Sequence, residues 1–196
     1  MSDTGVSINL NNTNPISKNR ALQTTPYTFT VTSSCDNGVG FNIYLATLNT
    51  NTLDASNIHY IITKNGSKDI LTEGILSDAT NALAEFTSDD QNQLNIGIKG
   101  TFGTIYKVYS YGIQSGEKDD YDLYLYVDSE VTDASTMGKT FNAGIAIKSY
   151  DYEFATINDV TTSNITTDSI TLTVNAVAGE NAIVKYYFSN NGGQVT

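Results

Sequence analysis

The chain has 196 residues, of which 39% are hydrophobic and only 16% are charged. This length is enough for one complete domain and part of another, since domains usually run to about 100–150 residues. Ten Lys and Arg against 21 Asp and Glu give a formal charge of -11, which repels phosphate backbones and anionic lipid surfaces. These values argue against nucleic-acid binding, and a surface rich in Thr and Asn favours strands over helices.

Alternation of apolar and polar residues recurs along the chain and predicts strands with one buried face. The expected inward-facing sets are Val6, Ile8 and Leu10; Tyr27, Phe29 and Val31; Phe41, Ile43 and Leu45; Ile58, Tyr60 and Ile62; Leu94, Ile96 and Ile98; Tyr121, Leu123, Leu125 and Val127; and Phe141, Ala143, Ile145 and Ile147. A further strand is expected over 104–113, but its register is ambiguous because apolar and aromatic residues occupy both faces. Residues 77–86 are expected to form a loop or a short helix.

Turn-forming residues separate the expected strands. Asp36-Asn37-Gly38 and residues 114–117 are expected to reverse the chain. Asn65-Gly66 predicts a hairpin with a type I′ turn, in which both central residues take positive φ.

Many short strands without a convincing long helix predict an all-β protein, an antiparallel β-sandwich of the jelly-roll or Ig-like kind, over residues 1–152. A new pattern begins at residue 158 and predicts a partial second β-module over 158–196. Its expected strand residues are Ile165, Ile170, Leu172 and Val174, then Val184, Tyr186 and Phe188 after a turn at 179–181.

Two segments of this second module carry a resemblance. Residues 165–174 and 183–189 resemble the first strands of a bacterial fibronectin type III or Ig-like repeat. The resemblance implies a parent protein that continues beyond Thr196, as a tandem array.

The longer N-terminal region is similar to surface-protein domains of Gram-positive bacteria, distantly of the camelysin/TasA class. The similarity rests on residues 25–32, 122–128 and 137–141. It implies a jelly-roll sandwich, export by a signal peptide and, in some members, fibres in which one subunit lends a strand to the next. Met1 to Gly5 lacks the basic and apolar regions of a signal peptide, so we expect that the leader of an exported parent is missing here.

The residue types give little indication of a catalytic site or a metal site. Cys35 and His59 are single copies, which argues against a zinc site, and each has an ordinary structural interpretation. We therefore expect no catalytic residue and no cofactor. Calcium is the one metal left open, with oxygen ligands offered by Asp119, Asp120, Asp122, Asp128, Glu130 and Asp133.

Thirteen tyrosines without a single Trp are the least ordinary feature of the composition. Tyr109, Tyr111, Tyr124 and Tyr126 crowd two expected strands and are candidates for a surface platform that binds a glycan or a protein. The alternative is cross-strand pairing that only stiffens the sheet.

Together these features predict a non-catalytic structural or adhesive module of a secreted or cell-surface bacterial protein. Its partners would be a protein or glycan at a cell surface, or further copies joined through strand edges. The alternatives are a strand-exchanging fibre subunit and a carbohydrate-active or carbohydrate-binding protein. No apolar run is long enough to span a membrane.

Overall fold

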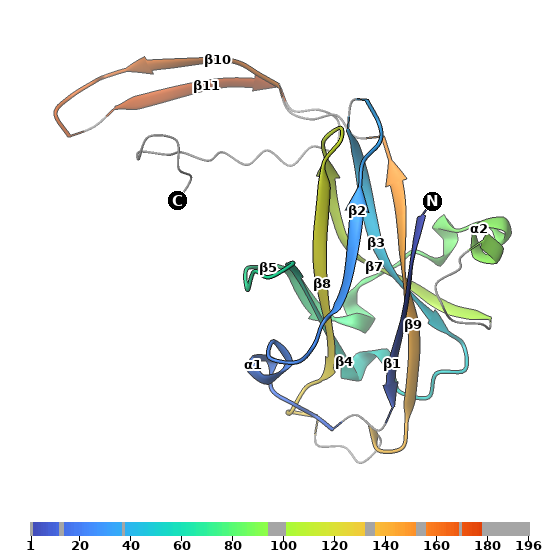
Figure 1. Cartoon of the computed structure of the whole chain (residues 1–196). Helices are drawn as coiled ribbons and strands as arrows, with labels where there is room; N and C mark the ends of the chain where they lie inside the picture. Colours follow the sequence, from blue (N-terminus) through green and yellow to red (C-terminus); the bar gives the residue numbers. More distant parts are fainter. Residues whose placement is uncertain are drawn as a thin grey trace. The chain divides into compact units, whose positions relative to one another are not determined.

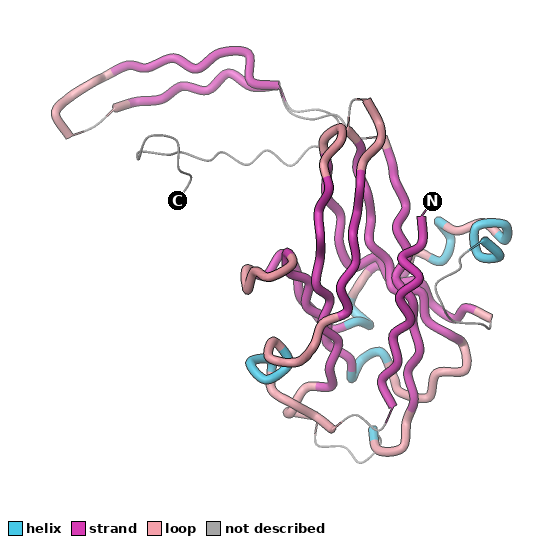
Figure 2. Tube along the Cα trace, in the orientation of Figure 1, coloured by secondary structure: helices cyan, strands magenta, loops and turns pink. Residues whose placement is uncertain are grey.

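The computed structural model describes residues 2–11, 14–36, 38–93, 101–131, 136–151, 156–168 and 170–177. The chain divides into two compact units, residues 1–150 and residues 151–196. Strands dominate the described part of both units, and the helical segments are short (Figure 2).

The first unit is built from strands joined by turns and short helical segments. The strands are β1 (Ser2–Asn11), β2 (Tyr27–Thr32), β3 (Val39–Leu48), β4 (Ile58–Lys64), β5 (Ile70–Ile75), β6 (Thr80–Asn81), β7 (Phe102–Ile113), β8 (Lys118–Val127) and β9 (Thr140–Tyr150). The helical segments are α1 (Lys18–Ala21), α2 (Ser88–Gln93) and the 3-10 turns Ala55–Asn57, Leu76–Asp78 and Leu83–Glu85.

The long strands form nested antiparallel pairs, in which β1 pairs with β9, β2 with β8, β3 with β7, and β4 with β5 (Figure 1). Pairing of β9 with β3 and of β8 with β4 then gives two sheets, ordered β1-β9-β3-β7-β6 and β2-β8-β4-β5. We call them sheet A and sheet C. A long hairpin folded in this way is a jelly roll, so the all-β sandwich prediction is confirmed and the Ig-like order is not the one found.

The main core fills the space between the two sheets, and most of its side chains are ones that the alternation placed inward; Leu53, Leu76, Val108 and Ile113 are members that it did not place. Tyr121 meets aromatic rings of both sheets there, with ring centroids 5.6 Å from Phe29 and 6.0 Å from Phe41. The fully enclosed members include Ile8, Ile43, Leu45, Ile58, Ile62, Leu123, Ala143 and Ile145. Period-two patterning therefore identified the core correctly in these strands.

The ambiguous register of β7 has a physical cause. Ile43 pairs with Tyr109 and Tyr44 with Lys107, so Val108 is an extra residue in a β-bulge. The extra residue shifts the alternation of inward and outward side chains by one position. Read with a strict period of two, the sequence of β7 therefore shows apolar residues on both faces of the strand.

Two turn predictions have different outcomes. Gly66 has φ +73°, but Asn65 is not among the described residues with positive φ, so the β4–β5 hairpin turn is not type I′. A five-residue connection joins the strands instead, closed by the Ser67 N–H donating to the Lys64 carbonyl at 2.9 Å. The turn at 114–117 is confirmed, with Gly116 at φ +73°.

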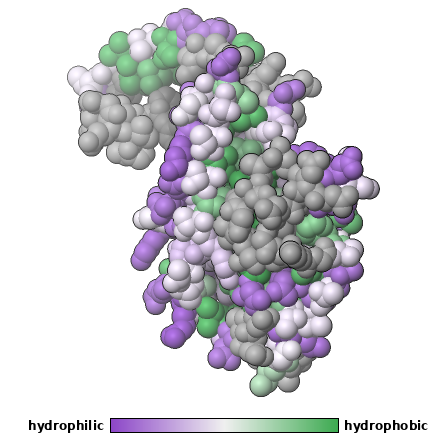
Figure 3. All heavy atoms as spheres, turned by 45° about the vertical axis from the view of Figure 1, so that its right-hand side comes forward, coloured by the Kyte–Doolittle hydropathy of each residue, from purple (hydrophilic) through white to green (hydrophobic). Residues whose placement is uncertain are grey.

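The second unit contains one described hairpin, β10 (Thr156–Ser163) paired antiparallel with β11 (Thr171–Val177). Ile165 and Ile170 were expected within a strand, but they lie in the connection between β10 and β11, where Asn164 takes φ +48°. Apolar side chains remain at the surface of this hairpin (Figure 3), with Val160 51% and Leu172 41% exposed.

Some elements were missed and some expectations lie outside the described residues. The edge strand β5 shows no clear alternation, and α2 begins with a capping box in which Thr87 and Asp90 bond each other's main-chain N–H groups at 3.1 and 2.9 Å. The strand expected at Leu94, Ile96 and Ile98, and the one at Val184, Tyr186 and Phe188, fall outside the described residues.

Replacing Leu123 by Ala should lower the free energy of unfolding by about 2–5 kcal/mol, because it opens a cavity between the sheets where the side chain is fully buried. Met137→Ala is the control: its side chain is 78% exposed, and its effect should stay within about 0.5 kcal/mol. Urea unfolding followed by tyrosine fluorescence measures both. Equal effects would contradict this core.

Candidate functional site

The four tyrosines predicted as one platform do not share a surface. Tyr109 and Tyr111 belong to β7 in sheet A, where their rings stack with centroids 5.9 Å apart, and Tyr109 lies 6.2 Å from the core ring of Tyr121. Tyr124 and Tyr126 belong to β8 in sheet C and point to its outer face. Only Tyr111, at 41%, is an exposed side chain among the four.

A chain segment around α1 covers the outer face of sheet C. Ala21 packs against Ile61 and Tyr126, leaving Tyr126 only 4% exposed. Main-chain hydrogen bonds fix this segment: the Ile16 N–H donates to the Val127 carbonyl at 2.9 Å, and the Ser129 N–H donates to the Ile16 carbonyl at 3.1 Å. The Tyr126 ring is therefore part of the packing, and its burial raises the pKa of its hydroxyl.

Three of the carboxylates considered for calcium, all on β8, are bonded to neighbouring segments, whereas Asp128 accepts from the Glu130 N–H within its own loop at 2.9 Å. Asp122 accepts from the Thr28 hydroxyl at 2.8 Å and from the Gly66 N–H at 3.2 Å, while Asp120 accepts from the Thr30 hydroxyl at 2.5 Å. Asp119 pairs with Lys64 at 2.9 Å. Within the described ranges no three acidic, His or Cys side chains are grouped to hold a metal ion, and Asp133 lies outside those ranges.

Cys35 and His59 lie on separate elements. Cys35 is exposed in the turn between β2 and β3. His59 lies on β4, and its ring centroid is 5.3 Å from that of Tyr126.

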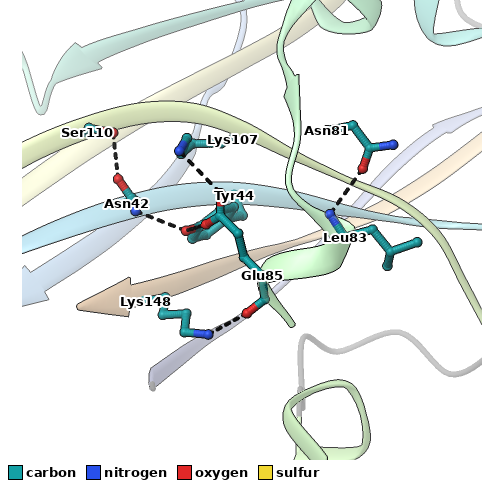
Figure 4. A network of polar contacts seen from close by, with 8 residues as sticks. All are labelled: Asn42, Tyr44, Asn81, Leu83, Glu85, Lys107, Ser110 and Lys148. Carbon is teal, nitrogen blue, oxygen red and sulfur yellow. Dashed lines mark hydrogen bonds and ion pairs between the residues drawn. The ribbon is translucent and has the colours of Figure 1, made fainter. Parts of the chain in front are cut away.

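A network of polar contacts surrounds Glu85 on the outer face of sheet A (Figure 4). The Tyr44 hydroxyl donates to its Oε2 at 2.7 Å, and Lys107 Nζ lies 3.3 Å from its Oε1. Asn42 Nδ2 donates to the Tyr44 hydroxyl at 3.0 Å, and Ser110 Oγ donates to Asn42 Oδ1 at 2.5 Å. These residues come from β3, β7 and the 3-10 turn Leu83–Glu85.

An apolar contact supports this network. Phe86 meets the ring of Tyr44 edge to face at 4.9 Å and is only 4% exposed. It packs in a cluster with Ala46 and Ala146, whose small side chains leave space for the ring on the sheet. Lys148 then lies across Phe86, with Nζ 5.1 Å from the ring centroid and 2.6 Å from the Glu85 main-chain carbonyl.

We call residues 82–90 the strap, because these contacts fasten them across sheet A. Lys148 also lies 3.6 Å from Asp90 at the end of the strap. The contacts of Tyr44, Lys107 and Lys148 therefore join three strands of the sheet to one segment of the chain.

The surroundings of Tyr44 and Glu85 shift their pKa values in opposite directions. Burial, together with the hydrogen bond to Glu85, raises the pKa of Tyr44 well above its usual range. Partial burial acts to raise the pKa of Glu85, but the hydrogen bond from Tyr44 and the charges of Lys107 and Lys148 outweigh it and lower the pKa. General acid–base catalysis requires groups that titrate near the working pH, whereas both of these groups move away from neutrality.

Sequence reasoning did not find this network. Tyr44 alternates with inward residues of β3, so its outward position was implied, but nothing local indicated a partner. The one available signal was the capping pattern at Thr87–Asp90, which marks a helix start next to Glu85 and Phe86.

Comparison with family models, with curated proteins and with solved structures finds no match to this chain. None of the helices in the described part of the chain has the length and apolar character that a membrane crossing requires.

Glu85→Gln should loosen the strap at neutral pH. The folded-state pKa of Glu85 is lowered, so its stabilising contribution is present above the unfolded-state pKa and is lost as the pH falls through the folded-state value. Hydrogen exchange at Ala82 gives the readout, since its N–H donates to the Ile105 carbonyl at 2.7 Å.

We expect faster Ala82 exchange in Glu85→Gln than in the wild type at pH 7, and equal exchange at a pH where Glu85 is protonated. Glu117→Gln, on the turn before β8, is the matched control and should leave the exchange rate of Ala82 unchanged. Identical rates for wild type and Glu85→Gln at pH 7 would show that Glu85 does not hold the strap.

Proposed function

We propose that this chain is a non-catalytic structural or adhesive module of a secreted or cell-surface bacterial protein. The proposal rests on one observation: in the described networks, polar side chains bond one segment of the chain to another. Glu85 holds the strap to sheet A, and Asp120 and Asp122 tie β8 to β2.

Both outer faces of the sandwich are covered in the same manner. The strap covers part of sheet A through Phe86, and the α1 segment covers part of sheet C through Ala21. The Lys18–Glu73 ion pair, at 2.5 Å, adds a polar contact between α1 and β5. This pattern suits a module whose task is to keep its shape, and the resemblance to Gram-positive surface domains supports the same interpretation.

A surface location can be tested on intact bacteria that produce the protein. Antibodies raised against the purified chain should label unpermeabilised cells, and brief trypsin treatment of those cells should remove the label. An antibody against a cytosolic enzyme of the same cells is the control for lysis. Labelling that requires permeabilisation would contradict the proposal.

A second candidate function, a strand-exchanging fibre subunit, is favoured by the position of β1. This strand is the edge of sheet A and pairs with β9 alone among the described strands. It contributes Ile8 and Leu10, 0% and 8% exposed, to the main core. A neighbouring copy that supplied its own β1 would restore the same main-chain bonds and the same buried side chains.

The register of β1 adds to this argument. Asp3 pairs with Ala146 and Ser7 with Gly144, so the ladder is interrupted between them. The first residues of the strand are therefore joined to β9 less regularly than Ile8 to Asn11, which pair with successive residues of β9. Exchange would begin at the irregular end.

Electron microscopy of the concentrated full chain should show fibres that disappear when residues 1–14 are removed. Ile8→Asp should abolish the fibres because it places a charge in the core of the receiving copy. Asn9→Asp is the matched control: the same charge on the exposed side of β1 should leave fibres intact. Fibres formed without residues 1–14, or a full chain that stays monomeric, would reject strand exchange.

A further inference from the structure

A cleft lies where the sandwich is open, between β5 at the edge of sheet C and β7 near the edge of sheet A. Its volume is about 330 Å³. The lining residues are Leu71, Thr72, Lys107, Val108, Tyr109 and Ser110.

Both strands are irregular at this cleft. Val108 is the extra residue of the β7 bulge, and Leu71 is the extra residue of β5, because Ile62 pairs with Thr72 while Thr63 pairs with Ile70. Val108 is 4% exposed, and Leu71 packs partly buried against the main core. Leu71 and Val108 are therefore the apolar part of the cleft's lining, which we call its floor, and both contact the main core; the remaining lining side chains carry polar groups.

One wall of the cleft is β7, part of whose outer main chain is paired with no described strand. The Ile105 carbonyl accepts from Ala82, so Ile105 directs its main-chain groups away from β3. On β3, the partner of Ile105 is Ala46, and Asn42 and Gly40 belong to the same alternating set of residues as Ala46. Ser110 and Gly112, which pair with Asn42 and Gly40, therefore also direct their main-chain groups away from β3. Among the described residues no strand pairs with Ser110 or Gly112 on that outer side.

The chain itself shows how this edge is used. Strand β6 adds antiparallel to β7, with Thr80 opposite Lys107 and Asn81 opposite Tyr106. Strand β6 ends where the cleft begins, because Lys107 both pairs with β6 and lines the cleft. An added strand beside Ser110 and Gly112 would continue the sheet from that point.

We propose that this edge binds an extended peptide of a partner protein as an additional strand on β7, with one apolar side chain inserted into the cleft. Main-chain bonds to Ser110 and Gly112 hold the peptide, and the floor of Leu71 and Val108 selects the inserted side chain. A volume of about 330 Å³ accommodates a side chain of leucine or phenylalanine size. The net charge of -11 favours a neutral or basic peptide.

The test uses the full chain and a fluorescein-labelled peptide of sequence KTVTLTVTK, followed by fluorescence anisotropy. The wild type should bind this peptide saturably. Replacing the central leucine of the peptide by aspartate should weaken binding at least about tenfold, because the cleft floor is apolar. Absence of saturable binding at millimolar peptide would overturn the proposal.

Two pairs of variants locate the binding. Ser110→Pro removes the outward N–H and should weaken binding at least about tenfold, whereas Ser110→Ala loses only the hydroxyl and should bind as the wild type does. Thr72→Tyr fills the cleft and should also weaken binding, with Thr72→Val as its control. Unfolding temperatures confirm that each variant is folded.

Binding that survives both Ser110→Pro and Thr72→Tyr would place the peptide elsewhere and overturn the proposal. Sedimentation could also show that the wild type is a dimer and that Ser110→Pro is a monomer. The occupant of the edge would then be a second copy of the chain, which would overturn the proposal that a partner's peptide binds there. Neither outcome depends on whether the protein lies at a cell surface or forms fibres through β1.

Discussion

Nested antiparallel pairing between the two halves of the chain is the constraint on which the first unit depends. Strand β1 meets β9, β2 meets β8 and β3 meets β7, so every one of these pairs joins residues far apart in sequence. This arrangement places Phe29 and Phe41 from the first half against Tyr121 from the second. The core can therefore form only when the whole unit has closed, which is expected of a fold dominated by long-range contacts.

The outer faces follow from the same pairing. Once β3, β7 and β9 lie side by side, Tyr44, Lys107 and Lys148 meet on the outer face of sheet A, where the strap docks through Glu85 and Phe86. Sheet C gathers Ile61, Tyr124 and Tyr126 in the same way, and the α1 segment covers them. The polar groups of these described networks hold chain segments in place, which is the basis for proposing a structural role.

Sequence patterning predicted the inner layer well because alternation with a period of two reports burial directly. The sets around Phe29, Ile43, Leu123 and Ile145 were placed inward correctly. The bulge at Val108 defeated the same reasoning in β7, since one extra residue shifts the alternation by one position. Tyr126 was expected at the surface because its strand alternates, but the segment that covers it lies about a hundred residues earlier in the sequence.

The candidate site was much less predictable than the fold. The contact of Glu85 with Tyr44 depends on where a strap docks, and a docking position leaves no local periodicity in the sequence. The cleft between β5 and β7 depends on two bulges and on which strands become edges, and both are properties of the closed sandwich. The residue types therefore argued against a zinc site and a catalytic Cys–His pair, but only the fold shows which residues contact one another.

A single nuclear Overhauser spectrum of the isotope-labelled full chain tests the nested pairing most directly. The account predicts cross-strand contacts for all four pairs together: Ile8 with Ala143, Thr30 with Asp120, Phe41 with Tyr111, and Tyr60 with Gly74. Main-chain ladder pairing of β1 with β2 and of β2 with β3, as in an up-and-down meander, would contradict it.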